Sequence, residues 1–172
     1  DLYLKKACAD MRAEEAALTS AITYGVLQNR AYLDFLLARF SARSLEKITP
    51  QVLDALRLGA YQLVYLTRIP HSAAVNETVE LVKKSKQRAL SGFVNGVLRG
   101  AQRNGYAYPL PDPEQEPVKA LGLQYDMPDW IVAIWLKDYG KEQTEILLQK
   151  MQQPGSVCLR ANTLKAEAGQ IG

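Results

Sequence analysis

The stretch that decides the fold is EKITPQVLDALRLGAYQLVYL, residues 46–66. Thr49 suits the N-cap of a helix and Pro50 suits the first helical position, so the stretch predicts a sharply defined helix start. Gly59 costs about 1 kcal/mol relative to alanine inside a helix, so we expect it to mark a close crossing with another helix. The apolar residues recur at spacings of three and four and predict a central helix: Val52, Leu53, Leu56, Ala60, Leu63 and Val64.

Two further amphipathic helices are predicted after Pro70, joined by a short connection that favours antiparallel packing. The first has an apolar stripe formed by Val75, Val79 and Val82. The second has an apolar face formed by Val94, Val97, Leu98 and Ala101. Glycine recurs every four residues along the second helix, and we expect close packing there at Gly92, Gly96 and Gly100.

His71 is the only histidine of the chain and lies between Pro70 and Ser72. We expect a partly exposed turn residue there, with Ser72 as the N-cap of the next helix. No second histidine exists and neither cysteine is near in sequence, so the pattern gives His71 no catalytic or metal-binding role. Cys8 and Cys158 form no CxxC pair, and we expect two reduced structural thiols.

The composition is that of an ordinary globular protein, with 172 residues, 48% apolar and 23% charged. This length allows one domain and a second, partial unit. No apolar run approaches the roughly 18 residues of a membrane helix, and no signal peptide is recognisable, so we expect a cytoplasmic protein without a membrane partner. The chain opens without methionine, and we interpret it as a fragment or a chain with an unobserved start. It contains no GxGxxG loop, P-loop, zinc-ligand spacing or nucleophile elbow.

Positive charge is concentrated in the first part of the chain. Residues 1–105 hold 15 Lys and Arg against 9 Asp and Glu, whereas residues 106–172 hold 6 against 9. The first part is therefore the better partner for a polyanion. The candidate phosphate-binding residues surround the connection between the two amphipathic helices: Lys83, Lys84, Lys86 and Arg88, extended by Arg99 and Arg103. The alternative is a charged turn that serves only solubility.

Residues 106–125 are predicted to form a proline-rich, semi-rigid linker. A new helix follows in DMPDWIVAIWLKDYG, with Asp126 as its N-cap and Gly140 as its end. Its expected apolar face consists of Trp130, Ile131, Ile134 and Trp135. KEQTEILLQKM predicts a further helix, and alternation of apolar and polar residues from Val157 predicts a strand.

Three blocks resemble the NusB-like helical RNA-binding domain: YGVLQNRAYLDFLL (24–37), LRLGAYQLVYLTRIPHSAAVNETVELVKK (56–84) and GFVNGVLR (92–99). Residues 127–165, from MPDWIVAIW to LRANTLK, resemble the segment that leads into the catalytic part of the bacterial 16S rRNA cytosine-5 methyltransferases of the RsmB (Sun/Fmu) family. The resemblance implies an all-α, NusB-like bundle over 1–105 without the first family helix. After the linker, residues 126–172 would be the truncated start of the methyltransferase N-terminal subdomain, a small helical segment leading into the strand.

The resemblance also implies a function. The chain would be the RNA-binding portion of an S-adenosylmethionine-dependent rRNA methyltransferase, with 16S rRNA and a Rossmann-like catalytic domain as partners. That domain, absent here, would bind the cofactor and supply the attacking cysteine. The chain alone would then be inactive, with no catalytic, cofactor or metal residues of its own. The sequence leaves the oligomeric state open.

The resemblance adds four candidate RNA-binding residues. Arg30 remains as a phosphate contact although the family often has arginine where Gln28 stands. Arg160, Asn162 and Lys165 match the family pattern R-x-N-T-x-K and are expected near RNA or the catalytic domain. Two alternatives stay open: a stand-alone NusB-like transcription antitermination factor that binds RNA and a ribosomal protein, and a scaffold that contacts only protein.

Overall fold

The structure, a computed structural model, describes residues 2–106 and 108–153, and all regular elements in these ranges are helical. They are α1 (Leu2–Ala7), α2 (Ala13–Gln28), α3 (Arg30–Phe40), η1 (Leu45–Lys47), α4 (Pro50–Tyr65), α5 (His71–Lys83), η2 (Arg88–Leu90), α6 (Ser91–Arg103), α7 (Pro117–Gln124) and α8 (Asp129–Met151). The all-α prediction is confirmed, whereas the predicted strand from Val157 lies outside the described residues. None of the described helices is long and apolar enough to cross a membrane.

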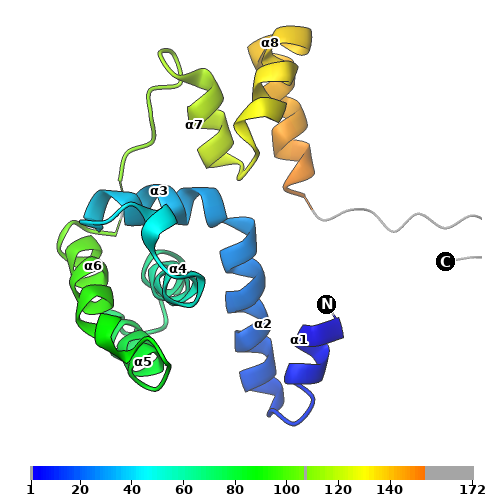
Figure 1. Cartoon of the computed structure of the whole chain (residues 1–172). Coiled ribbons are helices and arrows are strands. Elements are labelled where there is room, and N and C mark those ends of the chain that lie inside the picture. Colours follow the sequence, from blue (N-terminus) through cyan, green and yellow to red (C-terminus); the bar gives the residue numbers. More distant parts are fainter. Residues whose placement is uncertain (1, 107, 154–172) are drawn as a thin grey trace, which may run out of the picture.

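Helix α4 lies at the centre of the larger helical unit. Figure 1 looks along α4 and shows α2, α3, α5 and α6 around it, and α4 contacts all four. Thr49 and Pro50 occupy the N-cap and the first helical position as predicted, although the Thr49 hydroxyl makes no capping hydrogen bond. The buried residues of α4 are Val52, Ala55, Leu56, Gly59, Ala60 and Leu63. The central helix predicted from the sequence is therefore confirmed.

The close crossing predicted at Gly59 is also confirmed. A Cβ atom added to Gly59 would lie 2.7 Å from Leu98 Cδ1 and 3.0 Å from Thr78 Oγ1. Both neighbours are buried, and the Thr78 hydroxyl is held by its hydrogen bond to the carbonyl oxygen of Ala74, at 2.8 Å. Since these atoms have little room to move, the crossing of α4 with α5 and α6 requires glycine at this position.

The glycines of α6 behave differently from the prediction. A Cβ atom at Gly92 or Gly96 would meet no other atom within 4 Å, so these positions lie on the open surface. At Gly100 the nearest atom is Phe40 Cβ at 3.5 Å, an ordinary packing distance. The expected close packing is therefore wrong at Gly92 and Gly96, and only Gly100 packs against a neighbour. The buried face of α6 consists of its larger apolar residues, as predicted: Val94, Val97, Leu98 and Ala101.

An ion pair joins α3 to α4. Arg57 Nε lies 2.7 Å from Asp34 Oδ1, and a second guanidinium nitrogen donates to Asp34 Oδ2 at 2.7 Å. This hydrogen bonding to Asp34 raises the pKa of Arg57 above its usual value. Two parallel hydrogen bonds between a guanidinium and a carboxylate fix orientation as well as distance, so the pair sets how α3 lies on α4.

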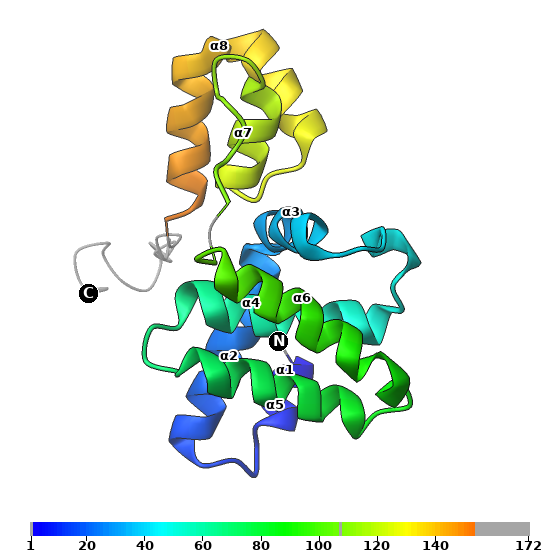
Figure 2. The ribbon, with the colours of Figure 1, turned by 90° about the vertical axis from the view of Figure 1, so that its left-hand side faces the viewer.

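Helices α7 and α8 form a smaller unit above α3 in Figures 1 and 2. Its buried apolar residues include Leu121, Tyr125, Val132 and Leu148. Gly140, with φ 73° and ψ 175°, interrupts α8 and divides it into the two helical segments predicted from the sequence. The predicted apolar face is wrong in part. Trp130 and Ile134 are 66% and 48% exposed, and Val132 is buried in their place.

The predicted linker is shorter than expected, because α7 occupies residues 117–124 within it. Tyr108 packs edge-to-face on Phe35 of α3, and the guanidinium of Arg39 lies over both rings at 4.9 and 4.8 Å. Asp126 is not the N-cap of α8, which is Pro128. Its Oδ1 instead accepts a hydrogen bond at 2.6 Å from the backbone N–H of Ala31, in the first turn of α3. These contacts attach the smaller unit to α3.

We expect Gly59→Ala to destabilise the larger helical unit by about 1–2 kcal/mol. Overpacking against Leu98 and Thr78 costs about 1–3 kcal/mol, and the better helix propensity of alanine offsets part of it. Gly96→Ala is the matched control, because its methyl group meets open space and should stabilise by about 0.5–1 kcal/mol. Urea unfolding followed by circular dichroism measures both changes. Equal effects of the two substitutions would contradict the close crossing.

Candidate nucleic-acid interface

The predicted basic residues surround the turn between α5 and α6. Figure 2 shows the two helices side by side, with the turn at one end of the pair. The side chains of Asn76 in α5 and Arg99 in α6 touch, with Arg99 donating to Asn76 Oδ1 at 3.2 Å. This pairing, far from the turn, establishes the predicted antiparallel arrangement. Val82 and Leu90 hold the two ends of the turn against the hydrophobic core.

Ser85 fixes the backbone of this turn. Its hydroxyl donates to the carbonyl oxygen of Val82 at 2.8 Å and accepts from the backbone N–H of Gln87 at 3.0 Å. The end of α5 and the start of η2 are therefore tied to one side chain. The cations that follow α5 lie near its C-terminus, where the helix dipole favours positive charge.

Lys83 and Arg88 line the same open hollow, which has a volume of about 690 Å³ and is completed by Ala89 and Ser91. Lys83 also lines a second hollow of about 340 Å³ between α5 and α6, together with Asn76, Val79, Glu80, Ser91, Gly92 and Asn95. We call these two hollows the α5–α6 groove. With glycine at 92 and no neighbour near it, the backbone of α6 is open to close approach along this groove.

One acidic residue lies among the cations. Lys83 Nζ contacts Glu80 Oε1 at 2.7 Å, and both side chains are about half exposed. Hydrogen bonding to Lys83, with a smaller effect of Lys84, lowers the pKa of Glu80. An exposed pair of this kind contributes little to stability, so a phosphate can replace Glu80 as the partner of Lys83 at small cost.

The other predicted residues are not all at the groove. Lys84 lines a different hollow, with Ile22, Leu58 and Leu81, on the side of α5 that faces α2 and α4. Lys86 is exposed within the turn. The structure thus brings Lys83 and Arg88 together, leaves Lys86 beside them and places Lys84 apart.

The three other arginines also differ in position. Arg99 lies at the far end of the α5–α6 groove, half-buried and hydrogen-bonded to Asn76 and Gln102. Arg103 is exposed one turn further along α6. Arg30 starts α3, beside Asp126, and Figures 1 and 2 show the start of α3 apart from the α5–α6 turn. The predicted Arg160, Asn162 and Lys165 lie outside the described residues.

Arg43 is a cation that the sequence analysis missed. It precedes η1, and its guanidinium lies over the ring of Phe93 at 5.4 Å. Phe93 belongs to the first turn of α6, so Arg43 comes to the end of α6 at which the groove starts. No local sequence pattern could link Arg43 to Phe93, because 50 residues separate them and only the fold brings them together.

His71 is the first residue of α5 and not a turn residue, and Pro70, not Ser72, is the N-cap. The ring is half-buried and packs on Tyr106, with 4.2 Å between centroids. Within residues 2–106 and 108–153, no group of three or more His, Cys, Asp or Glu side chains could hold a metal ion. Among the described residues Cys8 has no disulfide partner, and Cys158 lies outside them. The geometry explains His71 as a packing residue.

Comparison with known proteins finds two families that match successive parts of the chain. The NusB family matches residues 1–103, and the Methyltr_RsmF/B-like, ferredoxin-like domain matches residues 127–171. A probable ribosomal RNA small subunit methyltransferase B of Bacillus subtilis is 35% identical over 162 residues, which are 94% of this chain and 36% of the relative. A protein of the same description from Synechocystis is 37% identical over 151 residues, 87% of this chain and 33% of the relative. The chain thus spans about a third of the length of these curated relatives.

We expect Ser85→Ala to loosen the α5–α6 turn by about 1–2 kcal/mol, because two hydrogen bonds are lost. Amide hydrogen exchange at Gln87 should accelerate by roughly tenfold, since its N–H loses its acceptor. Ser72→Ala is the matched control, as Ser72 is an exposed serine in the first turn of α5. If exchange at Gln87 is the same in both variants, Ser85 does not fix the turn.

Proposed function

The chain belongs to the NusB family, and we propose that it is the RNA-binding portion of an S-adenosylmethionine-dependent 16S rRNA cytosine-5 methyltransferase. Its task would be to hold rRNA for a catalytic domain in the remainder of the protein. The observation that carries this proposal is the α5–α6 groove, where Lys83 and Arg88 line one open hollow. The match of residues 127–171 to the RsmF/B-like domain favours a methyltransferase over a stand-alone antitermination factor.

The chemistry of the groove suits a phosphate backbone. Lysine and arginine supply charge, and the hydroxyl of Ser91 and the amide of Asn95 supply hydrogen bonds. Gly92 and Gly96 leave room for an RNA strand to approach α6. Such contacts position RNA without reading its sequence, so discrimination must come from elsewhere.

The remaining steps belong to the rest of the protein. S-adenosylmethionine would bind in the Rossmann-like domain and provide the methyl group, and a cysteine there would attack the cytosine ring. The ring is accessible only when the base is unpaired or flipped out of a helix, so the target would be held in that state. The reaction would take place in the cytoplasm, and this chain alone would not catalyse it.

We expect Lys83→Gln, Lys86→Gln and Arg88→Gln, combined, to weaken binding of a single-stranded 16S rRNA segment. Each lost phosphate contact should reduce the slope of log affinity against log salt by about 0.7, or about 2 in total. Adding Lys84→Gln should change little, because Lys84 lies at another hollow. The matched control removes three exposed lysines of the smaller unit: Lys119, Lys137 and Lys150. An unchanged slope in the first variant, or an equal change in the control, would place RNA elsewhere.

In the full-length protein, we expect His71→Ala to leave methyl transfer to rRNA within about twofold of wild type. His71 packs on Tyr106 and has no acidic, cysteine or histidine cluster around it among the described residues. Single-turnover methylation with labelled cofactor measures the effect. A loss of about a hundredfold or more, the size expected for a missing general base, would show that His71 takes part in the chemistry.

A further inference from the structure

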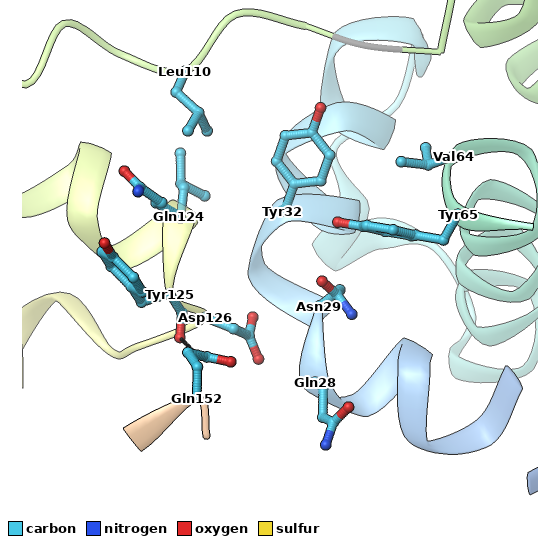
Figure 3. A pocket seen from close by; sticks show the side chains of 11 residues that line it. Gln28, Asn29, Tyr32, Val64, Tyr65, Leu110, Gln124, Tyr125, Asp126 and Gln152 are labelled. Atoms are coloured by element: carbon cyan, nitrogen blue, oxygen red, sulfur yellow. Dashed lines mark hydrogen bonds between the residues drawn. The ribbon is translucent and has the colours of Figure 1, made fainter. Parts of the chain in front are cut away.

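A pocket of about 350 Å³ lies where the two units meet, away from the α5–α6 groove. Figure 3 shows Tyr32 and Tyr65 on the side of the larger unit, with Gln124 and Asp126 on the side of the smaller unit. Asn29, at the junction of α2 and α3, belongs to the first side, and Gln152, at the end of α8, belongs to the second. The volume is at the lower end of the range for small-molecule sites, which suits one small planar group.

The pocket combines aromatic rings with primary amides. Gln28 and Gln124 line it, and neither side chain makes a hydrogen bond within the described part of the chain. Asn29 donates to the carbonyl oxygen of Gly25 at 2.8 Å, which orients its amide. A primary amide donates and accepts in one plane, as the edge of a nucleobase does, and tyrosine rings provide surfaces for stacking.

The charges of the pocket disfavour a phosphate as the group bound inside it. Of the described residues that line it, none is lysine or arginine, and Asp126 is acidic. A neutral ring with hydrogen-bond donors is therefore preferred over an anion. Arg30 is exposed at the start of α3, next to Asp126, where it can contact the phosphate attached to such a ring.

The walls of the pocket are held in place before any ligand binds. Asp126 is fixed by the N–H of Ala31, and Gln152 Nε2 donates to the carbonyl oxygen of Tyr125 at 2.6 Å. A preformed site loses less entropy on binding than a mobile one. A neighbouring open hollow of about 470 Å³ shares Gln28, Tyr125, Asp126 and Gln152 with the pocket and gives the adjoining nucleotide a way out.

We propose that this pocket receives one unpaired nucleobase of the bound RNA, an inference that rests on the proposed function. The base stacks on Tyr65 or Tyr32, and its edge pairs with the amides of Gln28 and Gln124. Because the carboxylate of Asp126 only accepts hydrogen bonds, bases with an exocyclic amino group, such as cytosine and adenine, bind better than uracil. The α5–α6 groove then supplies charge and this pocket supplies discrimination.

The test is titration of the 172-residue chain with cytidine, adenosine and uridine, followed by backbone amide NMR. Cytidine and adenosine should produce saturable shifts at residues 29–32 and 124–126, and uridine weaker ones. Tyr65→Leu should weaken cytidine binding by roughly 5- to 100-fold through the lost stacking surface. Gln124→Ala should also weaken it, because one hydrogen-bonding amide is lost. Gln124 is exposed, so its variant keeps the test valid if Tyr65→Leu does not fold. Tyr139→Leu, an exposed tyrosine of α8 outside the pocket, is the matched control.

Two results would overturn the proposal. They are the absence of shifts at these residues at any soluble concentration, and equal binding of ribose 5-phosphate. The combined Lys83, Lys86 and Arg88 variant separates this inference from the proposed function. It should bind cytidine as wild type does, whereas its RNA affinity falls. If the chain binds nucleosides but no RNA, the proposed function is refuted and the nucleobase site stands. If it binds RNA but no nucleosides, only the nucleobase site is refuted.

Discussion

At Gly59 the backbone of α4 comes so close to Leu98 and Thr78 that no side chain fits between them. This contact fixes α4 against α5 and α6 at the same point, and therefore fixes α5 and α6 against each other. The turn that joins them is anchored by Val82 and Leu90, and Ser85 holds its backbone. The position of Lys83 beside Arg88 is thus a consequence of packing at Gly59, Val82 and Leu90, rather than of the charges themselves, which repel.

A second constraint determines how the smaller unit lies on the larger one. Asp126 closes the first turn of α3 by accepting a hydrogen bond from the N–H of Ala31. Burial raises the pKa of Asp126, and this hydrogen bond offsets part of the rise. Arg39, whose guanidinium lies over the rings of Phe35 and Tyr108, fastens the start of the linker to the same helix. Helix α3 therefore carries both attachments, and the pocket lined by Tyr32 and Gln124 exists only because they hold the units together.

Much of the larger unit could be predicted because its signals are local. The Thr49–Pro50 start, the central position of α4 and the role of Gly59 follow from capping, periodicity and helix propensity. Asp126 was misassigned because an acid before a helix resembles an N-cap, and only the fold brings Ala31 to it. Helix α7 was missed because the prolines around it indicated a linker, although Pro117 occupies the first turn of a helix, where proline is tolerated. The α6 glycines indicated packing, but spacing does not reveal which face is buried.

The candidate site, too, could be predicted from the sequence only where its signals are local. Charge density identified the α5–α6 turn, but spacing alone did not separate Lys83 from Lys84, which line different hollows. Arg43 and the pocket between the units depend on contacts between distant segments and carry no local signal.

The different positions of Lys83 and Lys84 allow the most direct test of RNA binding in the α5–α6 groove. The chain is acetylated by a lysine-reactive reagent with and without a 16S rRNA segment, and the modified lysines are identified by mass spectrometry. Binding in the α5–α6 groove predicts that RNA protects Lys83 and Lys86 strongly and Lys84 and Lys137 weakly. Protection of Lys137 without protection of Lys83 would contradict it.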